Sequence, residues 1–371
     1  MKRQDFSRFP SVKSGLSRRQ FTLLASAVSG TAALGLPLAA RAAGGLPERF
    51  ADLYKAAAKE GSVIFYTDGR QETAQRISAF WKQVFPDVQL LITPLGSPAL
   101  IAQVETEYAA GQHRVDVTHM SQAYVAKLWK QKGFYEPYKA TTFNDFAPDY
   151  ADADGAYYSP ELYLLPAAFN TNAFPDRSAL PKSLADFLDP KWKGKIVMPD
   201  PTTSGNTLTF LQTLLAKNYI DWDYLTKLAT QNVLFVRGNP DVIRMLASGE
   251  RTLSPLLSTF NLEPAKHKGQ PIDSFVLKEG SIVVLSSMGI MAKAPHPNAA
   301  KLLVEALLSP EGQNVLTEYG AFWPANSTVK LKPGAPTIAS FHPIQQPPAT
   351  LDDQKKTDAF LAKFKQVFHR H

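Results

Sequence analysis

The sequence predicts an α/β protein built from two lobes. Its 371 residues exceed what one hydrophobic core usually serves, so two domains or two lobes are expected. Strand, turn and helix alternate in short units, which favours α/β layers around a largely parallel sheet. A long extended stretch at 157–174 interrupts this alternation, and a second series of α/β units follows it. The expected architecture is therefore two lobes, each with helices around a largely parallel sheet.

The first series begins with a β-rich run at 62–66, followed by an amphipathic helix that Pro86 ends. Asp68 is expected to be the N-cap of this helix, with Gln71 as its capping-box partner. A strand at 88–94 precedes a helix through Glu107. A strand at 115–120 then precedes a helix capped by Ser121, whose apolar residues are Val125, Leu128 and Trp129.

The second series contains strands at 195–198 and 233–239, a helix after Gly205 and a helix that ends at Gly249. The segment 281–316 predicts two short strands and two helices, the first with Pro297 near its N-terminus. The tail at 330–349 is rich in proline and is expected to be irregular. A last amphipathic helix is expected at 354–368.

The net charge of +7 is concentrated at the N-terminus. Residues 1–42 contain seven basic residues and one acidic residue, which leaves 33 basic and 32 acidic residues for the remainder. A nearly neutral body is not expected to bind nucleic acid. The chain contains no cysteine, which excludes disulfides, a thiolate nucleophile and cysteine-ligated metals.

Residues 1–42 are interpreted as an export signal. A basic region precedes the moderately apolar run 21–38, and Ala40-Arg41-Ala42 has the form that signal peptidases cleave. "SRRQF", at 17–21, resembles the twin-arginine export motif; the alternative is an ordinary secretory signal with two chance arginines. The mature chain, cut after about Ala42, is expected to be soluble in the periplasm.

Several segments resemble one family in the expected order. "LADFLDPKWKGKIVMPDP" at 184–201 and "APHPNAAKLLVEALLSPEGQNVLTEYG" at 294–320 are similar to signatures of the periplasmic substrate-binding proteins of ABC transporters. "LYKAAAKEGSVIFYT" at 53–67 and "MLASGERTLS" at 245–254 resemble further segments of that family, in the branch that holds the ferric-ion binders. The resemblance implies a type II periplasmic-binding fold, whose two lobes of mixed sheets flanked by helices are joined by two hinge-crossing strands and close over a ligand.

The resemblance also implies where the lobes divide. The crossing strands are expected within 161–170 and 281–290. The first lobe would then contain 43–162 and 285–320, and the second lobe 163–284 and 321–371.

Ten residues are candidates for ligand contact, because ligands of open α/β sheets bind beyond the carboxyl ends of strands. The first lobe offers Thr67, Asp68, Arg70, Ser97 and His119, and the second offers Thr202, Thr203, Ser204, Gly205 and Phe260.

Alternatives remain open at most of these positions. The hydroxyls and Gly205 lie at a predicted helix start, which suits an anion, but Thr203 or Ser204 could simply cap that helix. Arg70 could hold an anion bidentately or be a solvated residue of the first helical turn. His119 could donate to a ligand or satisfy backbone groups. Tyr163 could stack on a ligand, although aromatic residues before a crossing strand more often pack.

The expected function is capture of a small anionic solute, namely a carboxylate, phosphonate or phosphate ester, by hinge closure. A monomer would deliver the solute to an inner-membrane ABC permease, without cofactor, metal or catalytic residues. Ferric-ion binding is the alternative. The iron-binding members have a tyrosine pair after the segment that 245–254 resembles, whereas residues 253–269 contain Phe260 and no tyrosine. An exported enzyme is a further alternative, but 43–371 contain no HExxH, P-loop, G-x-S-x-G or dinucleotide-binding motif.

Overall fold

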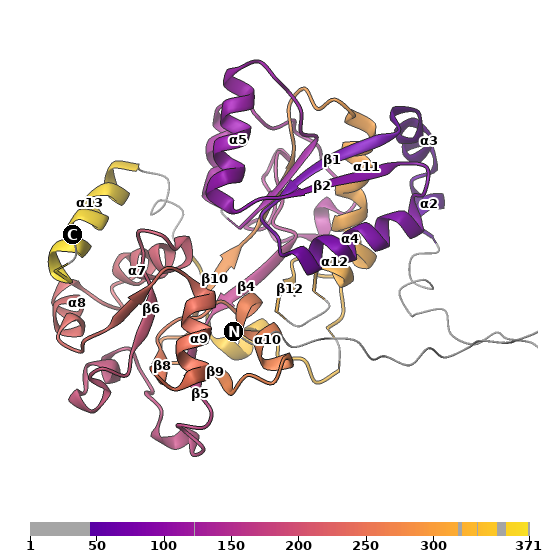
Figure 1. Cartoon of the computed structure of the whole chain (residues 1–371). Helices are drawn as coiled ribbons and strands as arrows, with labels where there is room; N and C mark the ends of the chain where they lie inside the picture. The colour runs from indigo at the N-terminus through magenta and orange to yellow at the C-terminus, as the bar shows by residue number, and fades with distance from the viewer. Residues whose placement is uncertain (1–44, 122, 318–320, 332, 347–353, 370–371) are drawn as a thin grey trace, which may run out of the picture.

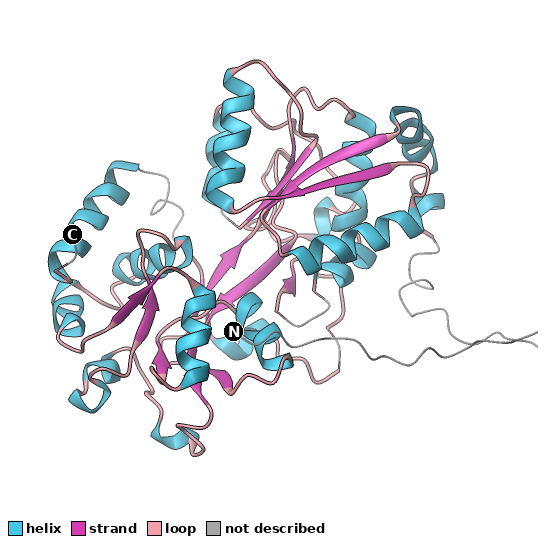
Figure 2. Ribbon diagram, viewed as in Figure 1, coloured by secondary structure: helices cyan, strands magenta, loops and turns pink. Residues whose placement is uncertain are grey.

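The computed structural model describes residues 45–121, 123–317, 321–331, 333–346 and 354–369. The export signal expected at 1–42 lies outside these residues and stays a prediction. Within the described ranges, no helix is both long enough and apolar enough to cross a membrane. Strands and helices alternate and gather into two bodies, which we call the first and the second lobe (Figures 1 and 2).

The first lobe is built on a four-stranded sheet covered by helices. Its elements are α2 (Leu46–Arg49), α3 (Ala51–Glu60), β1 (Ser62–Thr67), α4 (Gln71–Val84), β2 (Gln89–Pro94), α5 (Ser97–Ala109), β3 (Val117–Met120), α6 (Ala123–Gln131), η1 (Phe143–Asp145), β11 (Ser287–Ile290), α11 (Pro297–Leu308) and α12 (Pro310–Leu316). The strand order is β11-β3-β1-β2, in which β1, β2 and β3 are parallel and β11 is antiparallel to β3.

Both faces of this sheet are buried because its strands contribute side chains to two separate cores. Val63 and Phe65 of β1 join one apolar cluster with residues of α3, α4 and α11. Tyr66, which points to the opposite face, joins another cluster with residues of α5 and α6. In α6, Val125 and Trp129 are buried as expected, whereas Leu128 is 41% exposed.

Two strands carry the chain between the lobes. The connecting sheet has the order β12-β4-β10-β13 and contains β4 (Glu161–Leu165), β10 (Ser281–Leu285), β12 (Trp323–Pro324) and β13 (Pro343–Ile344); η5 (Ile338–Phe341) packs beside it. β4 and β10 are antiparallel, with Leu162 opposite Leu285. Beyond Pro166 the chain of β4 enters the second lobe, and beyond Ser286 the chain of β10 enters the first (Figure 1). The lobe boundaries proposed after 162 and before 285 fall within these strands.

The second lobe contains two small sheets and a C-terminal helix. Its elements are β5 (Ala167–Asn170), η2 (Arg177–Ala179), η3 (Ala185–Leu188), η4 (Pro190–Trp192), β6 (Val197–Pro199), α7 (Gly205–Ala216), α8 (Trp222–Ala229), β7 (Leu234–Val236), α9 (Asn239–Ser248), β8 (Leu253–Ser254), α10 (Thr259–His267), β9 (Ile272–Phe275) and α13 (Gln354–Val367). One sheet is antiparallel with the order β8-β5-β9, and the other pairs β6 with β7 in parallel.

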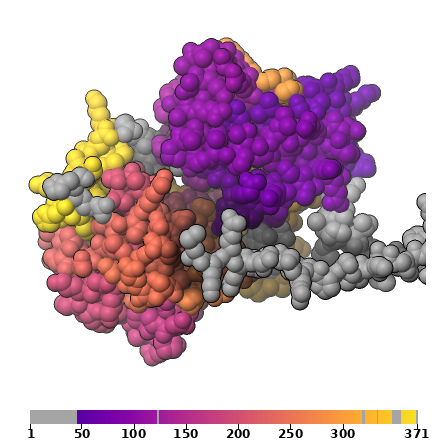
Figure 3. Space-filling view, in the orientation of Figure 1, coloured from indigo at the N-terminus to yellow at the C-terminus, as the bar shows by residue number. Residues whose placement is uncertain are grey.

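The lobes have separate hydrophobic cores. The second lobe contains two clusters of its own, and Phe360 and Phe364 attach α13 to the larger one. In the space-filling view, the indigo-to-purple surface of the first lobe and the pink-to-orange surface of the second form distinct masses (Figure 3). Separate cores joined by two strands are the arrangement that permits hinge motion.

Candidate ligand-binding site

The predicted residues of the first lobe gather at one edge of its sheet. Thr67 ends β1 and lies opposite His119 of β3, and Ser97 is the first residue of α5. The backbone N–H of Asp68 donates to the carbonyl of His119 (3.1 Å). Because β1, β2 and β3 are parallel, their carboxyl ends bring these residues together, as expected for such sheets.

Asp68 organises this edge through its carboxylate and does not cap a helix. It accepts hydrogen bonds from the Ser97 hydroxyl (2.6 Å) and from the Ser121 amide (2.8 Å) and hydroxyl (3.2 Å). Burial raises the pKa of Asp68, against the opposing effects of His119 and these hydrogen bonds. The predicted N-cap role is wrong: α4 begins at Gln71 with Arg70 at the N-cap, because three donors beyond neighbouring strands hold the Asp68 carboxylate.

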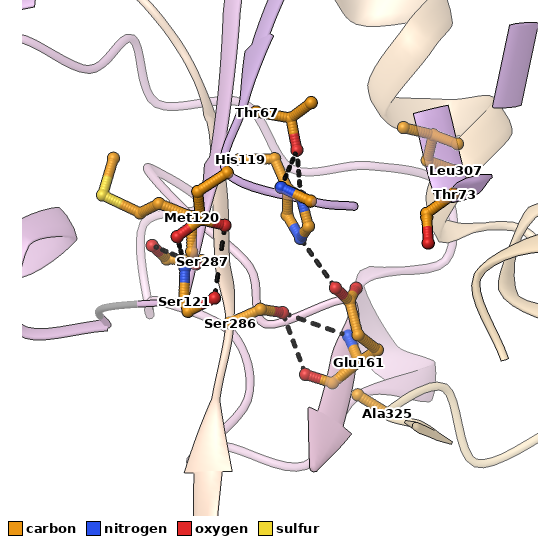
Figure 4. A network of polar contacts seen from close by, with 12 residues as sticks. Thr67, Thr73, His119, Met120, Ser121, Glu161, Ser286, Ser287, Leu307 and Ala325 are labelled. Carbon is orange, nitrogen blue, oxygen red and sulfur yellow. Dashed lines mark hydrogen bonds and ion pairs between the residues drawn. The ribbon is translucent and has the colours of Figure 1, made fainter. Parts of the chain in front are cut away.

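His119 lies inside the protein, between the first lobe and a crossing strand (Figure 4). One ring nitrogen, Nδ1, is 3.0 Å from the Thr67 hydroxyl, and Nε2 is 2.7 Å from Glu161 Oε1 at the start of β4. The Ser286 hydroxyl donates to the Glu161 carbonyl (2.9 Å), so β10 joins the same network. Burial lowers the pKa of His119, but the charges of Glu161 and Asp68 outweigh it and raise that pKa overall. His119 and Thr67 therefore position the hinge strand.

The predicted residues of the second lobe form the turn between β6 and α7. The Thr202 hydroxyl and amide both donate to Asp200 Oδ1, at 2.6 and 2.8 Å. The Thr203 hydroxyl donates to the Arg237 carbonyl (2.9 Å). Ser204 is the N-cap of α7 and accepts from the Thr207 amide (3.4 Å), so the capping alternative describes its contact.

The amides of Gly205 and Asn206 mark the N-terminus of α7. Neither donates to a partner within the part of the chain that the structure describes. The positive end of a 12-residue helix dipole coincides with these two N–H groups. The turn therefore offers an anion two backbone donors, whereas its hydroxyls are used locally.

We predict that Ser204→Ala separates capping from ligand contact. Loss of the cap should lower the free energy of unfolding by about 1 kcal/mol, because the Thr207 amide loses its acceptor. Urea unfolding measures this change, and calorimetric titration with a bound anion measures affinity. A residue that only caps leaves the affinity unchanged. If the binding free energy falls by more than the unfolding free energy does, Ser204 also touches the ligand.

Tyr163 connects the edges of the two lobes. Its hydroxyl donates to Asn206 Oδ1 in α7 (2.8 Å). Burial, together with the charges of Asp68 and Glu161, raises the pKa of the Tyr163 phenol, and hydrogen bonds with Ser121 and Asn206 offset this only partly. Tyr163 thus lies between the Asp68 network and the start of α7. The sequence contains only a weak signal for this role, namely a tyrosine inside a crossing strand.

Arg70 and Phe260 make a direct contact between the lobes. Arg70 Nη1 donates to the Phe260 carbonyl (2.8 Å), and Arg70 Nε lies 3.6 Å from Glu72 Oε2. The Phe260 ring packs edge-on against Tyr163, with centroids 5.2 Å apart, and stacks on Phe322 at 5.8 Å. Arg70 is therefore not a fully solvated residue of the first helical turn, because it is only partly exposed and contacts the opposite lobe. Its binding of an anion stays a prediction.

Of the ten predicted residues, the structure brings Asp68, Ser97, Arg70 and Phe260 close to Tyr163 or to the interlobe contact. Gly205 adjoins Asn206, which contacts Tyr163 directly. Thr67 and His119 lie beneath this surface, and the Thr202 and Thr203 hydroxyls bond within their own lobe. Ser121, Tyr163, Asn206 and Glu161 are additional members of the site. Across the described part of the chain, no group of three or more His, Asp or Glu side chains is placed to hold a metal ion.

Two lobes joined by crossing strands, with polar loops at the edges that face each other, form an arrangement suited to a solute-binding protein. Residues 115–347 match the family model described as "Bacterial extracellular solute-binding protein", and the chain belongs to this family. The expected membership is thereby confirmed, and family and structural relatives are binding proteins.

Comparisons with individual proteins agree with this family assignment. The Fe(3+)-binding periplasmic protein of Serratia marcescens is 22% identical over 275 residues, which are 72% of this chain and 79% of that protein. Iron-bound HitA from Pseudomonas aeruginosa superposes with a TM-score of 0.71 at 21% identity, over 82% of this chain and 99% of that chain. AfuA from Actinobacillus pleuropneumoniae, with fructose-6-phosphate bound, superposes with a TM-score of 0.69 at 22% identity, over 83% of this chain and 99% of that chain. These likenesses confirm the type II periplasmic-binding fold.

Proposed function

We propose that this chain captures a small anionic solute between its lobes and delivers it to an inner-membrane ABC permease. The ligand would contact the Asp68–Ser97–Ser121 edge of the first lobe and the start of α7 in the second. Bridging both surfaces would stabilise the closed form relative to the open form. The mature protein would act as a periplasmic monomer after cleavage near Ala42, without cofactor or turnover.

The observation that carries this proposal is the position of Arg70. A permanently charged guanidinium of the first lobe is bound to a carbonyl of the second, at the contact that closure would form. A guanidinium has five N–H donors in a fixed plane and binds carboxylate or phosphate more strongly than a neutral carbonyl. An anionic ligand would therefore exchange with the Phe260 carbonyl and keep the lobes joined.

Ferric-ion binding remains the second candidate, because a relative and a structural neighbour are iron-binding proteins. Ferric ion prefers phenolate and carboxylate oxygens. Phe260 supplies no side-chain oxygen, and the raised pKa of Tyr163 disfavours its phenolate form. The carboxylates of Asp68 and Glu161 are already engaged by hydroxyls, an amide and His119. These features favour the anion.

A thermal-shift screen tests the proposal. We expect one of a panel of carboxylates, phosphonates and phosphate esters to stabilise the protein, by about 2.7 kcal/mol at a ligand concentration of 100 Kd. The same ligand should bind Arg70→Gln at least about tenfold more weakly, because charge-assisted hydrogen bonds are lost. The exposed Arg244→Gln is the matched control. Stabilisation by ferric citrate or spermidine alone would refute anion capture, and turnover of a stabilising compound would indicate an enzyme.

A further inference from the structure

A cavity of about 170 Å³ lies between α4 of the first lobe and α10 of the second. Arg70, Thr73 and Arg76 face it from α4, and Phe260, Pro264 and Lys268 face it from α10 or just beyond. α4 packs on β2 and α12, while α10 packs on α9 and β9, so the two walls of the cavity belong to different lobes. It begins at the Arg70–Phe260 contact and thus adjoins the site described above.

The charges around this cavity favour an anion. Three basic side chains, those of Arg70, Arg76 and Lys268, face it, and Glu72 is the one carboxylate that does so within the described residues. The pKa of Glu72 is lowered, first by a hydrogen bond from its own backbone amide and then by the charges of Arg70 and Lys268. Slight burial of Glu72 opposes this effect. Arg70 is also the N-cap of the 14-residue helix α4, so the positive end of the helix dipole adds to the field.

The remaining wall is mostly apolar. Phe260 and Phe322 stack with their ring planes 18° apart, Leu316, Ala321 and Pro264 extend the apolar surface, and His267 adds an imidazole. Such a surface solvates neither a hydrated metal ion nor a sugar well, because their polar groups would lose water without gaining partners. It suits an aromatic ring, which gains from both burial and ring contacts.

The volume limits the size of that ring. A dry apolar cavity of about 150 Å³ is known to accept benzene. The cavity of about 170 Å³ therefore accommodates one six-membered ring, with the charged group outside it beside Arg70.

We propose that the ligand is a monocyclic aromatic carboxylate, whose ring fills the cavity between α4 and α10 and whose carboxylate binds Arg70. This inference rests on the proposed function and names its substrate class. The carboxylate takes the place of the Phe260 carbonyl on Arg70 Nη1, while the ring contacts Phe260 of one lobe and Thr73 of the other. Closure then depends on the apolar body as well as on the charge.

Calorimetric titration of the purified full chain with matched probes tests this inference. Benzoate contains both ring and charge, acetate the charge alone and benzyl alcohol the ring alone. We expect benzoate to bind at least about tenfold more tightly than either, because only benzoate combines burial of the ring with the charge-assisted contact to Arg70. Arg70→Gln should weaken benzoate at least about tenfold, and the control Arg244→Gln should not.

A second variant separates the ring from the charge. Thr73 is half-buried on α4, so Thr73→Leu fills part of the cavity while preserving the helix. Benzoate affinity should fall at least about tenfold and acetate affinity should stay unchanged. Three outcomes would overturn the inference. They are equal affinities for benzoate and acetate, no binding of benzoate, and a Thr73→Leu variant that binds benzoate as tightly as the wild type. Arg70-dependent binding of inorganic phosphate in that event would leave anion capture standing, whereas binding of ferric citrate or spermidine alone would refute both.

Discussion

Replacing Glu161 by alanine should destabilise the protein by about 3–5 kcal/mol at pH 6, as expected when one partner of a buried ion pair is removed. Glu161 and His119 are 3% and 6% exposed, and their side chains are 2.7 Å apart. Without the carboxylate, burial beside Thr67 disfavours protonation of the imidazole, and only the charge of Asp68 still supports it. Urea unfolding followed by circular dichroism measures the loss.

The same pair predicts a pH dependence of stability. The pKa of His119 is raised in the folded protein, so its stabilising effect is fully present below the unfolded pKa of about 6.5. This effect is lost as pH rises through the raised folded value. The difference in unfolding free energy between wild type and Glu161→Ala should therefore shrink from pH 6 towards alkaline pH. Glu161→Gln, which keeps a hydrogen-bond acceptor, should flatten the pH profile with a smaller loss at pH 6.

Glu136→Ala is the matched control, because Glu136 also forms an ion pair but its side chain is partly exposed beside Lys301. The control substitution should lower the free energy of unfolding by less than about 1 kcal/mol. If Glu161→Ala costs no more than this control at pH 6, or if the cost is independent of pH, the pair does not hold the crossing strand as described.

Gly312→Ala should destabilise the first lobe by about 3 kcal/mol, at the upper end of overpacking effects. A Cβ at Gly312 would lie 2.0 Å from the Ala306 carbonyl oxygen and 2.6 Å from Leu307 Cα. Both atoms belong to the backbone of α11, so no side-chain rotation relieves the clash and α12 has to move away. Thermal or urea unfolding measures the effect.

Gly45→Ala is the control for this substitution, since a Cβ there meets no atom within 4 Å. It should change the unfolding free energy by less than about 0.5 kcal/mol. Gly312→Ala with wild-type stability would mean that α11 and α12 separate easily. A stable Gly312→Ala variant with altered ligand affinity would place the α11–α12 corner in the binding mechanism.

The segment around Gly312 explains why part of the family resemblance is structural. Ser309 caps α12 by accepting from the Gly312 amide (3.1 Å), and Pro310 occupies the first helical position. Gln313 donates to the Leu307 carbonyl (3.1 Å) and accepts from the Ala325 amide (3.0 Å). Four residues of "SPEGQ" thus serve the junction of α11 and α12, whereas Glu311 pairs with Arg49 of α2 (3.0 Å).

Most helices were predictable because their signals are local. The apolar spacing before Pro86 marks α4, Ser204 and Gly205 mark the start of α7, and Gly249 ends α9 with φ of 76°. Leu128 shows the limit of such signals. It lies at helical spacing beside buried residues, yet no element of the described chain covers it, and it is 41% exposed.

The candidate site was predictable as a set of loops but not as a set of contacts. The carboxyl ends of successive strands indicate Asp68, Ser97 and the turn before α7 without any coordinates. The hydroxyl partners of Asp68 and the carbonyl partner of Arg70 are 29 to 190 residues away in the sequence, and no periodic pattern specifies them. Asp68 was therefore predicted as a helix cap, although the folded sheet places stronger donors beside it.

The sequence by itself determined the two-lobe α/β organisation, the family and the loops that we propose as the ligand-binding site, because periodicity, caps and turns act over a few residues. Only the tertiary structure decided that His119 is buried against Glu161, that Tyr163 reaches Asn206 and that Arg70 binds the opposite lobe. Those pairings depend on how separately folded segments pack, and packing is set by contacts between residues that are distant in the chain.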